Sequence, residues 1–259
     1  MARRRRLDAE LVAQGLFSTT DEAMRAVLAG DVSTTDHRMT SPGEQVLPGI
    51  LLHVRGRDAY VGRGGHKLER ALDEFCVDPA GLACLDVGCS TGGFTDCLLQ
   101  RGAASVVAVD VGEAQFAWSL RQDARVELLE RTNITDVPGE GRDGSIDLAV
   151  CDVSFTSVGA VAPAVARLLR DDGAFITLVK PQFECPREDV GEGGIVRDPA
   201  AWAWALEHAA AACAGEGLAP QAACASPITG RKGNHEFLLL CRKGADAALL
   251  DCAAVAASV

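Results

Sequence analysis

From about position 82 onward, short apolar runs alternate with amphipathic stretches along the chain. Strands are predicted at 82–87, 105–110, 125–130, 146–152, 174–180, 219–225 and 236–241. Helices are predicted at 67–75, 93–101, 113–121, 157–170, 199–214 and, in an alanine-rich stretch, 245–259. This alternation predicts a doubly wound α/β fold in which helices cover both faces of a parallel sheet. A ligand of such a sheet lies at the carboxyl ends of its strands.

The first 57 residues follow a different pattern. A short helix is predicted from Leu7 to Gly15, and a second helix is predicted to begin at the capping box Thr19-x-x-Glu22 and to end at Gly30. Extended segments are predicted from Val32 and over 46–54. We therefore expect a small α+β domain at 1–57, a glycine-rich linker at 58–66 and a larger α/β domain at 67–259.

The strand that contains Asp86 runs into the turn Gly88-Cys89-Ser90-Thr91-Gly92-Gly93-Phe94, which opens a helix. Glycine has no Cβ, so such a turn lets the backbone approach a ligand closely. The next strand ends at Asp110, whose carboxylate can accept hydrogen bonds from ribose hydroxyls. Ser90 stands where the dinucleotide fingerprint has the glycine that admits a pyrophosphate. S-adenosylmethionine, which carries no phosphate, therefore fits better than NAD, and an NAD-linked oxidoreductase is disfavoured.

Composition narrows the class of protein. A hydrophobic content of 48% over 259 residues excludes wholesale disorder. The 10 cysteines include no Cys-x-x-Cys pair, which indicates reduced core thiols and, with the dispersed histidines, no metal site. The basic N-terminus lacks the apolar stretch of a signal peptide, and no apolar run reaches the roughly 18 residues of a membrane span. A cytoplasmic protein is expected.

The net charge of −11 argues against a nucleic-acid partner until its distribution is considered. Residues 1–75 contain 11 basic and 11 acidic residues, so the whole excess of negative charge lies in the remainder. Two basic clusters, at 3–6 and 55–70, could neutralise phosphates of a polyanion. The candidate RNA-binding residues are Arg3, Arg4, Arg5, Arg6, Arg55, Arg63 and Arg70.

Four charged residues fall at element junctions. Asp152 and Lys180 end two apolar strands, Lys67 starts the helix before the first strand, and Glu236 begins the last strand. A partly buried ammonium needs a carboxylate partner, and Asp152 on the neighbouring strand end is the natural one for Lys180. Two lysines and two carboxylates around one cofactor indicate proton abstraction from a weak acid.

These motifs, in their order along the chain, resemble the TlyA family of ribosomal RNA methyltransferases, once described as haemolysins. The shared motifs lie at 63–68, 86–96, 109–112, 151–155, 179–184 and 230–237. The resemblance implies an S4-like RNA-binding domain followed by an FtsJ-like, Rossmann-like methyltransferase domain. It implies methyl transfer from S-adenosylmethionine to a ribose 2′-hydroxyl, of a cytidine in ribosomal RNA within one or both ribosomal subunits.

The resemblance also implies roles for individual residues. The catalytic set would be Lys67, Asp152, Lys180 and Glu236. The cofactor-binding set would be Asp86, Gly88, Ser90, Thr91, Gly92, Gly93, Phe94, Asp110, Asn133 and Asp152. Lys180 would take the hydroxyl proton or orient the hydroxyl, and Asp152 would position Lys180. The chain departs from the family in lacking a glycine near Asp36 and in having Glu192 where a basic residue is common.

Two other functions stay open. One is an S4-type RNA-binding protein whose second domain has lost catalysis, against which the intact set of four charged residues argues. The other is a pore-forming haemolysin, which requires amphipathic or membrane-spanning segments that the sequence does not show.

Overall fold

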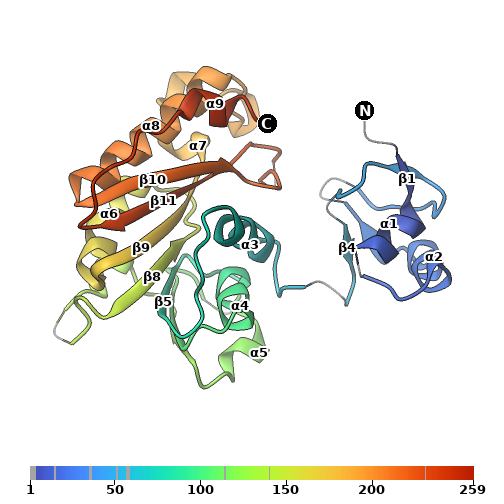
Figure 1. Ribbon diagram of the computed structural model, residues 1–259, viewed down its shortest axis with the longest axis horizontal. Coiled ribbons are helices and arrows are strands. Elements are labelled where there is room, and N and C mark those ends of the chain that lie inside the picture. The colour runs from blue at the N-terminus through green and yellow to red at the C-terminus, as the bar shows by residue number, and fades with distance from the viewer. Residues whose placement is uncertain are drawn as a thin grey trace. The chain divides into compact units, whose positions relative to one another are not determined.

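The computed structural model describes residues 4–14, 16–34, 37–50, 52–56, 59–113, 115–139, 141–230 and 232–259. The chain divides into two compact units, 1–59 and 60–259 (Figure 1). Three residues named above, Arg3, Gly15 and Asp36, lie outside the described residues. The S4-like character of the smaller unit stays a prediction.

The described residues of the smaller unit form two helices and two small antiparallel sheets. Its elements are β1 (Arg5–Arg6), α1 (Leu7–Ala13), α2 (Thr20–Ala29), β2 (Val32–Ser33), β3 (Gln45–Val46) and β4 (His53–Val54). Strand β1 pairs with β3, and β2 pairs with β4. The Thr19 side chain caps α2 by accepting from the Glu22 N–H, and the left-handed Gly30 ends the helix, as predicted.

One prediction for the smaller unit is wrong. The segment 46–54 does not form one extended strand but is divided between β3 and β4. Pro48 has no N–H to donate to a ladder, and Gly49 has a left-handed φ of 81°. Together they impose a turn between the two short strands.

The larger unit is a mixed α/β domain around a seven-stranded sheet of order β10-β11-β9-β8-β5-β6-β7. Its helices are α3 (Gly64–Glu74), α4 (Gly93–Gln100), α5 (Trp118–Arg121), α6 (Val158–Leu168), α7 (Pro181–Glu184), α8 (Pro199–Gly215) and α9 (Cys252–Ala256). Its strands are β5 (Ala83–Val87), β6 (Ser105–Val109), β7 (Val126–Leu129), β8 (Ile146–Cys151), β9 (Leu169–Val179), β10 (Leu218–Ala225) and β11 (Phe237–Lys243). Three 3-10 turns, η1 (Ile134–Asp136), η2 (Arg187–Asp189) and η3 (Glu192–Gly194), lie in the loops.

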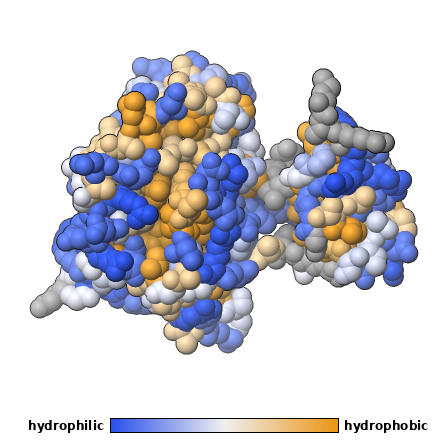
Figure 2. Space-filling model, in the orientation of Figure 1, coloured by the Kyte–Doolittle hydropathy of each residue, from blue (hydrophilic) through white to orange (hydrophobic). Residues whose placement is uncertain are grey.

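Helices cover both faces of this sheet, as predicted (Figure 1). Side chains of β5 alternate between the faces, because successive residues of a strand point in opposite directions. Leu85 and Val87 pack with α6 and α8, whereas Cys84 packs with α3 and α4. In Figure 2, hydrophobic residues run through the middle of the visible face of this unit between hydrophilic borders.

The expectation of an all-parallel sheet is wrong at one edge. Strand β11 is antiparallel to both β9 and β10. The connection from β10 to β11 is too short for the crossover of a dozen or more residues that parallel neighbours need. The chain therefore returns as an antiparallel strand, which brings Glu236 back to the edge of the sheet where β9 ends.

Three predicted helices differ from the structure. The helix expected at 113–121 is only α5, because the loop after β6 is folded around Asp110, which accepts from the Gly112 N–H. The alanine-rich end forms only α9, since the preceding residues run along β10, where the Ala248 N–H donates to the Pro220 carbonyl. Helix α3 starts at Gly64, inside the predicted linker.

The cysteines lie mostly in the core. All 10 cysteines are free thiols, and Cys76 alone among them is exposed. Burial raises the pKa of the Cys84 thiol to about 12, so it behaves as an inert core group. Among the described residues, no helix combines the length and the apolar character that crossing a membrane requires.

Candidate active site

The carboxyl ends of β5, β8 and β9 meet at one edge of the sheet, and a cavity of about 720 Å³ lies there. Its walls come from the turn between β5 and α4, the residues after β8 and β9, the start of α3 and the loop that precedes β11. The volume is in the range of pockets that hold small-molecule ligands and cofactors. The cavity therefore lies where the strand pattern placed a ligand.

Two ion pairs between buried or half-buried groups line this cavity. Lys67 Nζ lies 2.5 Å from Glu236 Oε2, and Lys180 Nζ lies 2.6 Å from Asp152 Oδ1. Lys180 Nζ also donates to Ser154 Oγ at 2.9 Å. The structure thus brings all four predicted catalytic residues to one cavity and pairs Lys180 with Asp152. Each carboxylate offsets the cost of removing an ammonium from water.

Local structure fixes the backbone at Lys180 and Asp152 and the position of the Glu236 side chain. Lys180 directly precedes Pro181, the first residue of α7, and the N–H of Asp152 donates to the carbonyl of Val87. Glu236 lies against Gly230, where an added Cβ would come within 2.6 Å of Glu236 Oε1. Only glycine at that position leaves room for the carboxylate.

The glycine-rich turn forms another wall. Gly88, Ser90 and Gly92 all have left-handed φ values, of 80°, 48° and 97°. Their conformation turns the chain into α4, whose first N–H groups have no acceptor within the helix. Of the six turn residues predicted to bind the cofactor, five line the cavity: Gly88, Ser90, Thr91, Gly93 and Phe94. Gly92 belongs to the turn without being part of the cavity wall.

Asp86 lies beneath this turn, fully buried. Its Oδ2 accepts from the N–H and the hydroxyl of Thr95, at 2.9 and 2.6 Å, while Oδ1 has no hydrogen-bond partner among the described residues. Burial is the main reason why the pKa of Asp86 rises to about 7. Asp86 is therefore not part of the cavity wall; it anchors the start of α4.

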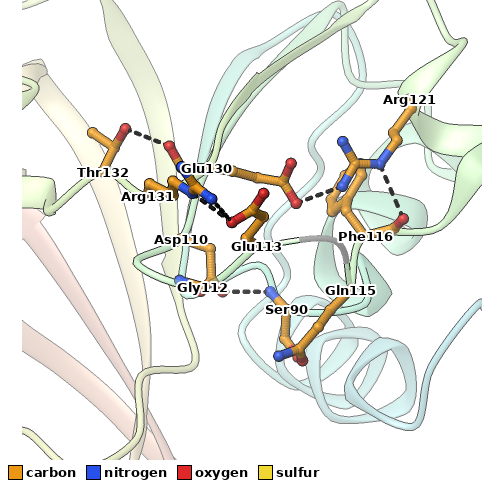
Figure 3. Close-up of polar contacts among 10 residues, drawn as sticks. All are labelled: Ser90, Asp110, Gly112, Glu113, Gln115, Phe116, Arg121, Glu130, Arg131 and Thr132. Atoms are coloured by element: carbon orange, nitrogen blue, oxygen red, sulfur yellow. Dashed lines mark hydrogen bonds and ion pairs between the residues drawn. The ribbon is translucent and has the colours of Figure 1, made fainter.

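Asp110, predicted to hold a ribose, supports the turn from the other side (Figure 3). Its two carboxylate oxygens accept from the N–H groups of Ser90 and Gly112, both at 2.7 Å. Each oxygen keeps a second acceptor position. Two ion pairs, Glu113 with Arg131 and Arg121 with Glu130, tie the adjoining loops together (Figure 3).

Asn133 is exposed and lies outside the cavity lining. Its side-chain oxygen accepts from the Thr135 N–H at 3.1 Å and so caps η1. Neither Asp110 nor Asn133 is thus brought to the cavity together with the charged residues.

The cavity fits a nucleoside that carries an α-amino acid group. The first N–H groups of α4 have no acceptor within the helix and suit a carboxylate. The carboxylate of Asp152 on the cavity wall can accept from an ammonium. S-adenosylmethionine has both groups.

An exposed aromatic residue at this cavity was not foreseen. Phe155 is 91% exposed, has a left-handed φ of 66° and lines the cavity. Its ring centroid lies 5.3 Å from that of Phe183, with the planes inclined at 49°. The sequence places a phenylalanine after a strand end but gives no sign that the ring faces solvent. The left-handed backbone angle of Phe155, which only the structure shows, is the feature that marks this residue.

Two further residues that line the cavity, Asn234 and Lys232, were given no role by the sequence. Asn234 is 3% exposed, and its amide accepts from the Val196 N–H at 3.0 Å and donates to the Gly194 carbonyl at 2.8 Å. It therefore holds the glycine-rich loop around η3 against the segment that leads to Glu236. Lys232 of that segment donates to the Gly193 carbonyl at 3.3 Å and lines the cavity.

The predicted RNA-binding arginines of the smaller unit are partly engaged within it. Arg5 pairs with Glu10 at 2.7 Å and Arg6 with Asp8 at 2.6 Å, and both acids are buried. The hydrogen bond from Arg6 is the main cause of a lowered pKa of Asp8. These two arginines therefore stabilise the first helix of the unit.

The remaining candidate arginines differ in their exposure and in their partners. Arg55 lies 3.9 Å from Asp31 with 82% of its side chain exposed, and Arg4 donates to the carbonyl of Gln45 at 3.4 Å. In the larger unit, Arg70 pairs with Glu74 on the surface of α3. Arg63 donates to the Thr229 carbonyl at 3.0 Å and lines the cavity.

A search for clusters of potential metal ligands among the described residues finds none.

Residues 60–243 match the FtsJ-like methyltransferase family. The match covers most of the chain and includes the turn, the two ion pairs and the cavity, so the chain belongs to the FtsJ-like methyltransferases. It is accordingly a methyltransferase with a mixed α/β fold.

Relatives narrow the family further. YqxC of Bacillus subtilis, which carries an rRNA methyltransferase name, is 46% identical over 240 residues, which span 92% of this chain and 85% of that protein. The 16S/23S rRNA (cytidine-2′-O)-methyltransferase TlyA of Mycobacterium tuberculosis is 44% identical over 251 residues, spanning 96% and 94%. A solved structure from Streptococcus thermophilus that carries the name hemolysin has a TM-score of 0.76 and 39% identity, and covers 100% of this chain and 96% of that one. The chain is a member of the TlyA family, and the resemblance drawn from its motifs is confirmed.

The raised pKa of Asp86 predicts a pH dependence of stability. Its value of about 7 lies above the ordinary 3.8, so between these pH values the native state holds a proton that the unfolded state has released. The free energy of unfolding should therefore fall as pH rises through this window, by up to about 1.4 kcal/mol per pH unit. Asp86→Asn should flatten the decline.

Urea unfolding of the full chain at pH 5, 6, 7 and 8 would measure this effect. Asp189→Asn, an exposed site, serves as the control and should follow the wild type. Parallel curves for the wild type and Asp86→Asn would contradict the prediction.

Proposed function

We propose that this protein transfers a methyl group from S-adenosylmethionine to the 2′-hydroxyl of a cytidine in ribosomal RNA, acting on ribosomal subunits in the cytoplasm. The observation that carries the proposal is the pair of ion pairs, Lys67–Glu236 and Lys180–Asp152, on the wall of one cavity beside the glycine-rich turn. The names of the relatives support the substrate: TlyA of Mycobacterium tuberculosis is named for cytidine-2′-O-methylation of 16S and 23S rRNA.

The turn would hold the cofactor. The N–H groups of Gly93 and Phe94, at the start of α4, suit the amino-acid carboxylate, and Asp110 can accept from ribose hydroxyls through its second acceptor positions. Bound S-adenosylmethionine supplies an electrophilic methyl group on a sulfonium. The residues of the turn are preorganised for this task by three left-handed positions.

Lys180 is the residue that acts on the hydroxyl. It takes the proton of the 2′-hydroxyl or orients that hydroxyl, while Asp152 and Ser154 fix the position of its Nζ. Lys67 and Glu236 bind the nucleotide and keep the local charge balanced. Positioning of this kind can lower the activation free energy by roughly 7–11 kcal/mol. General-base catalysis can raise the rate by about 10² to 10⁴-fold.

Phe155 and Phe183 provide an apolar surface beside these groups. Sequence-specific RNA recognition commonly splays a base out of its stack and places it on an aromatic ring. We assign this role to Phe155, whose exposed ring lines the same cavity as Lys180. The exposed arginines would add affinity for RNA phosphates, as would Lys232 at the cavity.

The assay for the proposed function uses ribosomal subunits from cells that lack the gene. Incubation with the full chain and methyl-labelled S-adenosylmethionine should label the RNA, and mapping should place the label on a ribose 2′-oxygen. An RNA-binding protein without catalysis would bind the subunits and leave them unlabelled.

Lys180→Ala should abolish methyl transfer, with a loss of at least about 10²-fold, because the acting amine is gone. Affinity for S-adenosylmethionine, measured by calorimetry, should stay near the wild-type value, since the turn is untouched. Lys180→Arg keeps the charge but cannot release a proton at neutral pH, so an inactive arginine variant indicates proton abstraction rather than orientation. Lys243→Ala, on β11, is the control, and a wild-type rate in Lys180→Ala would refute the role.

Phe155→Gly should separate activity from stability. Glycine relieves a left-handed conformation that costs an L-residue about 1–2 kcal/mol, so the variant should unfold at the same temperature as the wild type or higher. The loss of a stacked base should lower kcat/KM for RNA by about 5- to 150-fold. Phe155→Ala, which keeps the strain, should lose the same activity without the gain in stability. Wild-type kcat/KM in the glycine variant would contradict the assigned role.

The arginines of the smaller unit should differ in what they contribute. Arg55→Gln should weaken RNA binding and reduce the slope of log K against log salt by about 1, with stability unchanged. Arg6→Gln breaks the pair with the buried Asp8 and should lower stability as well. Filter binding at several salt concentrations and thermal unfolding measure the two effects, and an unchanged slope in Arg55→Gln would exclude that contact.

A further inference from the structure

Glu184, the last residue of α7, is a buried carboxylate to which the sequence assigns no role. It is 7% exposed. Its Oε1 accepts from the N–H of Val158 and its Oε2 from the hydroxyl of Ser157, both at 2.7 Å. Glu184 follows β9, and both of its carboxylate oxygens thus accept hydrogen bonds from the residues that begin α6, which follows β8.

These contacts complete a series that joins two segments of the active site. The segment 152–158 carries Asp152 and Phe155, and the segment 180–184 carries Lys180 and Phe183. At one end the segments are joined by the ion pair, and in the middle by the two aromatic rings. Glu184 joins them at the far end.

The loop between Asp152 and Val158 needs such a fixed end. Phe155 has a left-handed φ, and a strained conformation persists only where the surrounding contacts determine it. The N–H of Asp152 is held by the carbonyl of Val87 at 3.0 Å, which fixes the start of the loop. Glu184 fixes its end, and the N-terminus of the 11-residue helix α6 stabilises the negative charge there.

The geometry points to Glu184 as a positioning residue for methyl transfer: it holds the 152–158 loop so that Asp152 aligns Lys180 and Phe155 faces the substrate. This inference rests on the proposed function. It adds to that function a residue that does not touch substrate or cofactor and acts through the loop alone.

The test compares Glu184→Ala, Glu184→Gln and Ser157→Ala in the full chain, with Glu188→Ala, an exposed glutamate on η2, as the control. Glutamine keeps both contacts, since its carbonyl accepts from Val158 and its amide can donate to the Ser157 hydroxyl. Three quantities are measured well below the unfolding temperature: kcat and KM on ribosomal subunits, affinity for S-adenosylmethionine, and hydrogen exchange of 153–158.

Glu184→Ala should lower kcat by about 10- to 100-fold, because a displacement near 1 Å can cost that much. Hydrogen exchange over 153–158 should accelerate, affinity for S-adenosylmethionine should be unchanged, and Glu184→Gln should restore kcat. Ser157→Ala removes one of the two contacts to Glu184 and also the cap of α6, since the Ser157 hydroxyl accepts from the Gly159 N–H. It should lower kcat less than Glu184→Ala does and accelerate exchange over 153–158, and it is the variant to use if Glu184→Ala does not fold.

Three results would overturn the inference: unchanged kcat in the alanine variants, unchanged exchange over 153–158, or an equal loss of cofactor affinity and kcat, which marks a general structural effect. If the wild type transfers no methyl group to RNA, the proposed function is wrong, and the exchange measurement still decides whether Glu184 fixes the loop.

Discussion

Two ion pairs at one edge of the sheet, in which Lys67, Glu236 and Lys180 are buried and Asp152 is half-buried, are the constraint on which this structure depends. Removing one partner from a buried pair costs about 3–5 kcal/mol, because the other charge is left without compensation. Lys67 on α3 pairs with Glu236 before β11, and Lys180 after β9 pairs with Asp152 after β8. Each pair joins elements far apart in the sequence, so the site forms only when the sheet is assembled, and the antiparallel return of β11 is part of that assembly.

Two of the acids that the sequence assigned to the cofactor, Asp86 and Asp110, support the turn itself. Asp86 binds Thr95 in the first turn of α4, and Asp110 binds the N–H of Ser90. These contacts hold three left-handed residues in a conformation that costs free energy where the residue is not glycine, as at Ser90. The turn is therefore rigid before any ligand arrives, which lowers the entropic cost of binding.

Sequence reasoning succeeded where one local rule applied. Apolar strands that end in polar residues predicted that Asp152 and Lys180 would meet, since parallel strands end at the same edge. It singled out Lys67 and Glu236 at element junctions and through family motifs but did not predict their pairing, since 169 positions separate them. A count of charges could not reveal that Asp8 and Glu10 engage Arg6 and Arg5, because that depends on burial. Periodicity likewise gave no sign that Phe155 is exposed, since its direction follows from one strained backbone angle.

The distribution of charge around the cavity reconciles an acidic protein with a polyanionic substrate. The chain has a net charge of −11, yet among the described residues the charged side chains that line the cavity are Arg63, Lys67, Lys180, Lys232, Asp152 and Glu236, four positive against two negative. A ligand responds to the local potential, which low-dielectric walls concentrate, more than to the average surface. The two carboxylates are already paired with Lys67 and Lys180, so the excess positive charge belongs to Arg63 and Lys232. A phosphate group at the mouth of the cavity therefore meets attraction even though the protein as a whole would repel it.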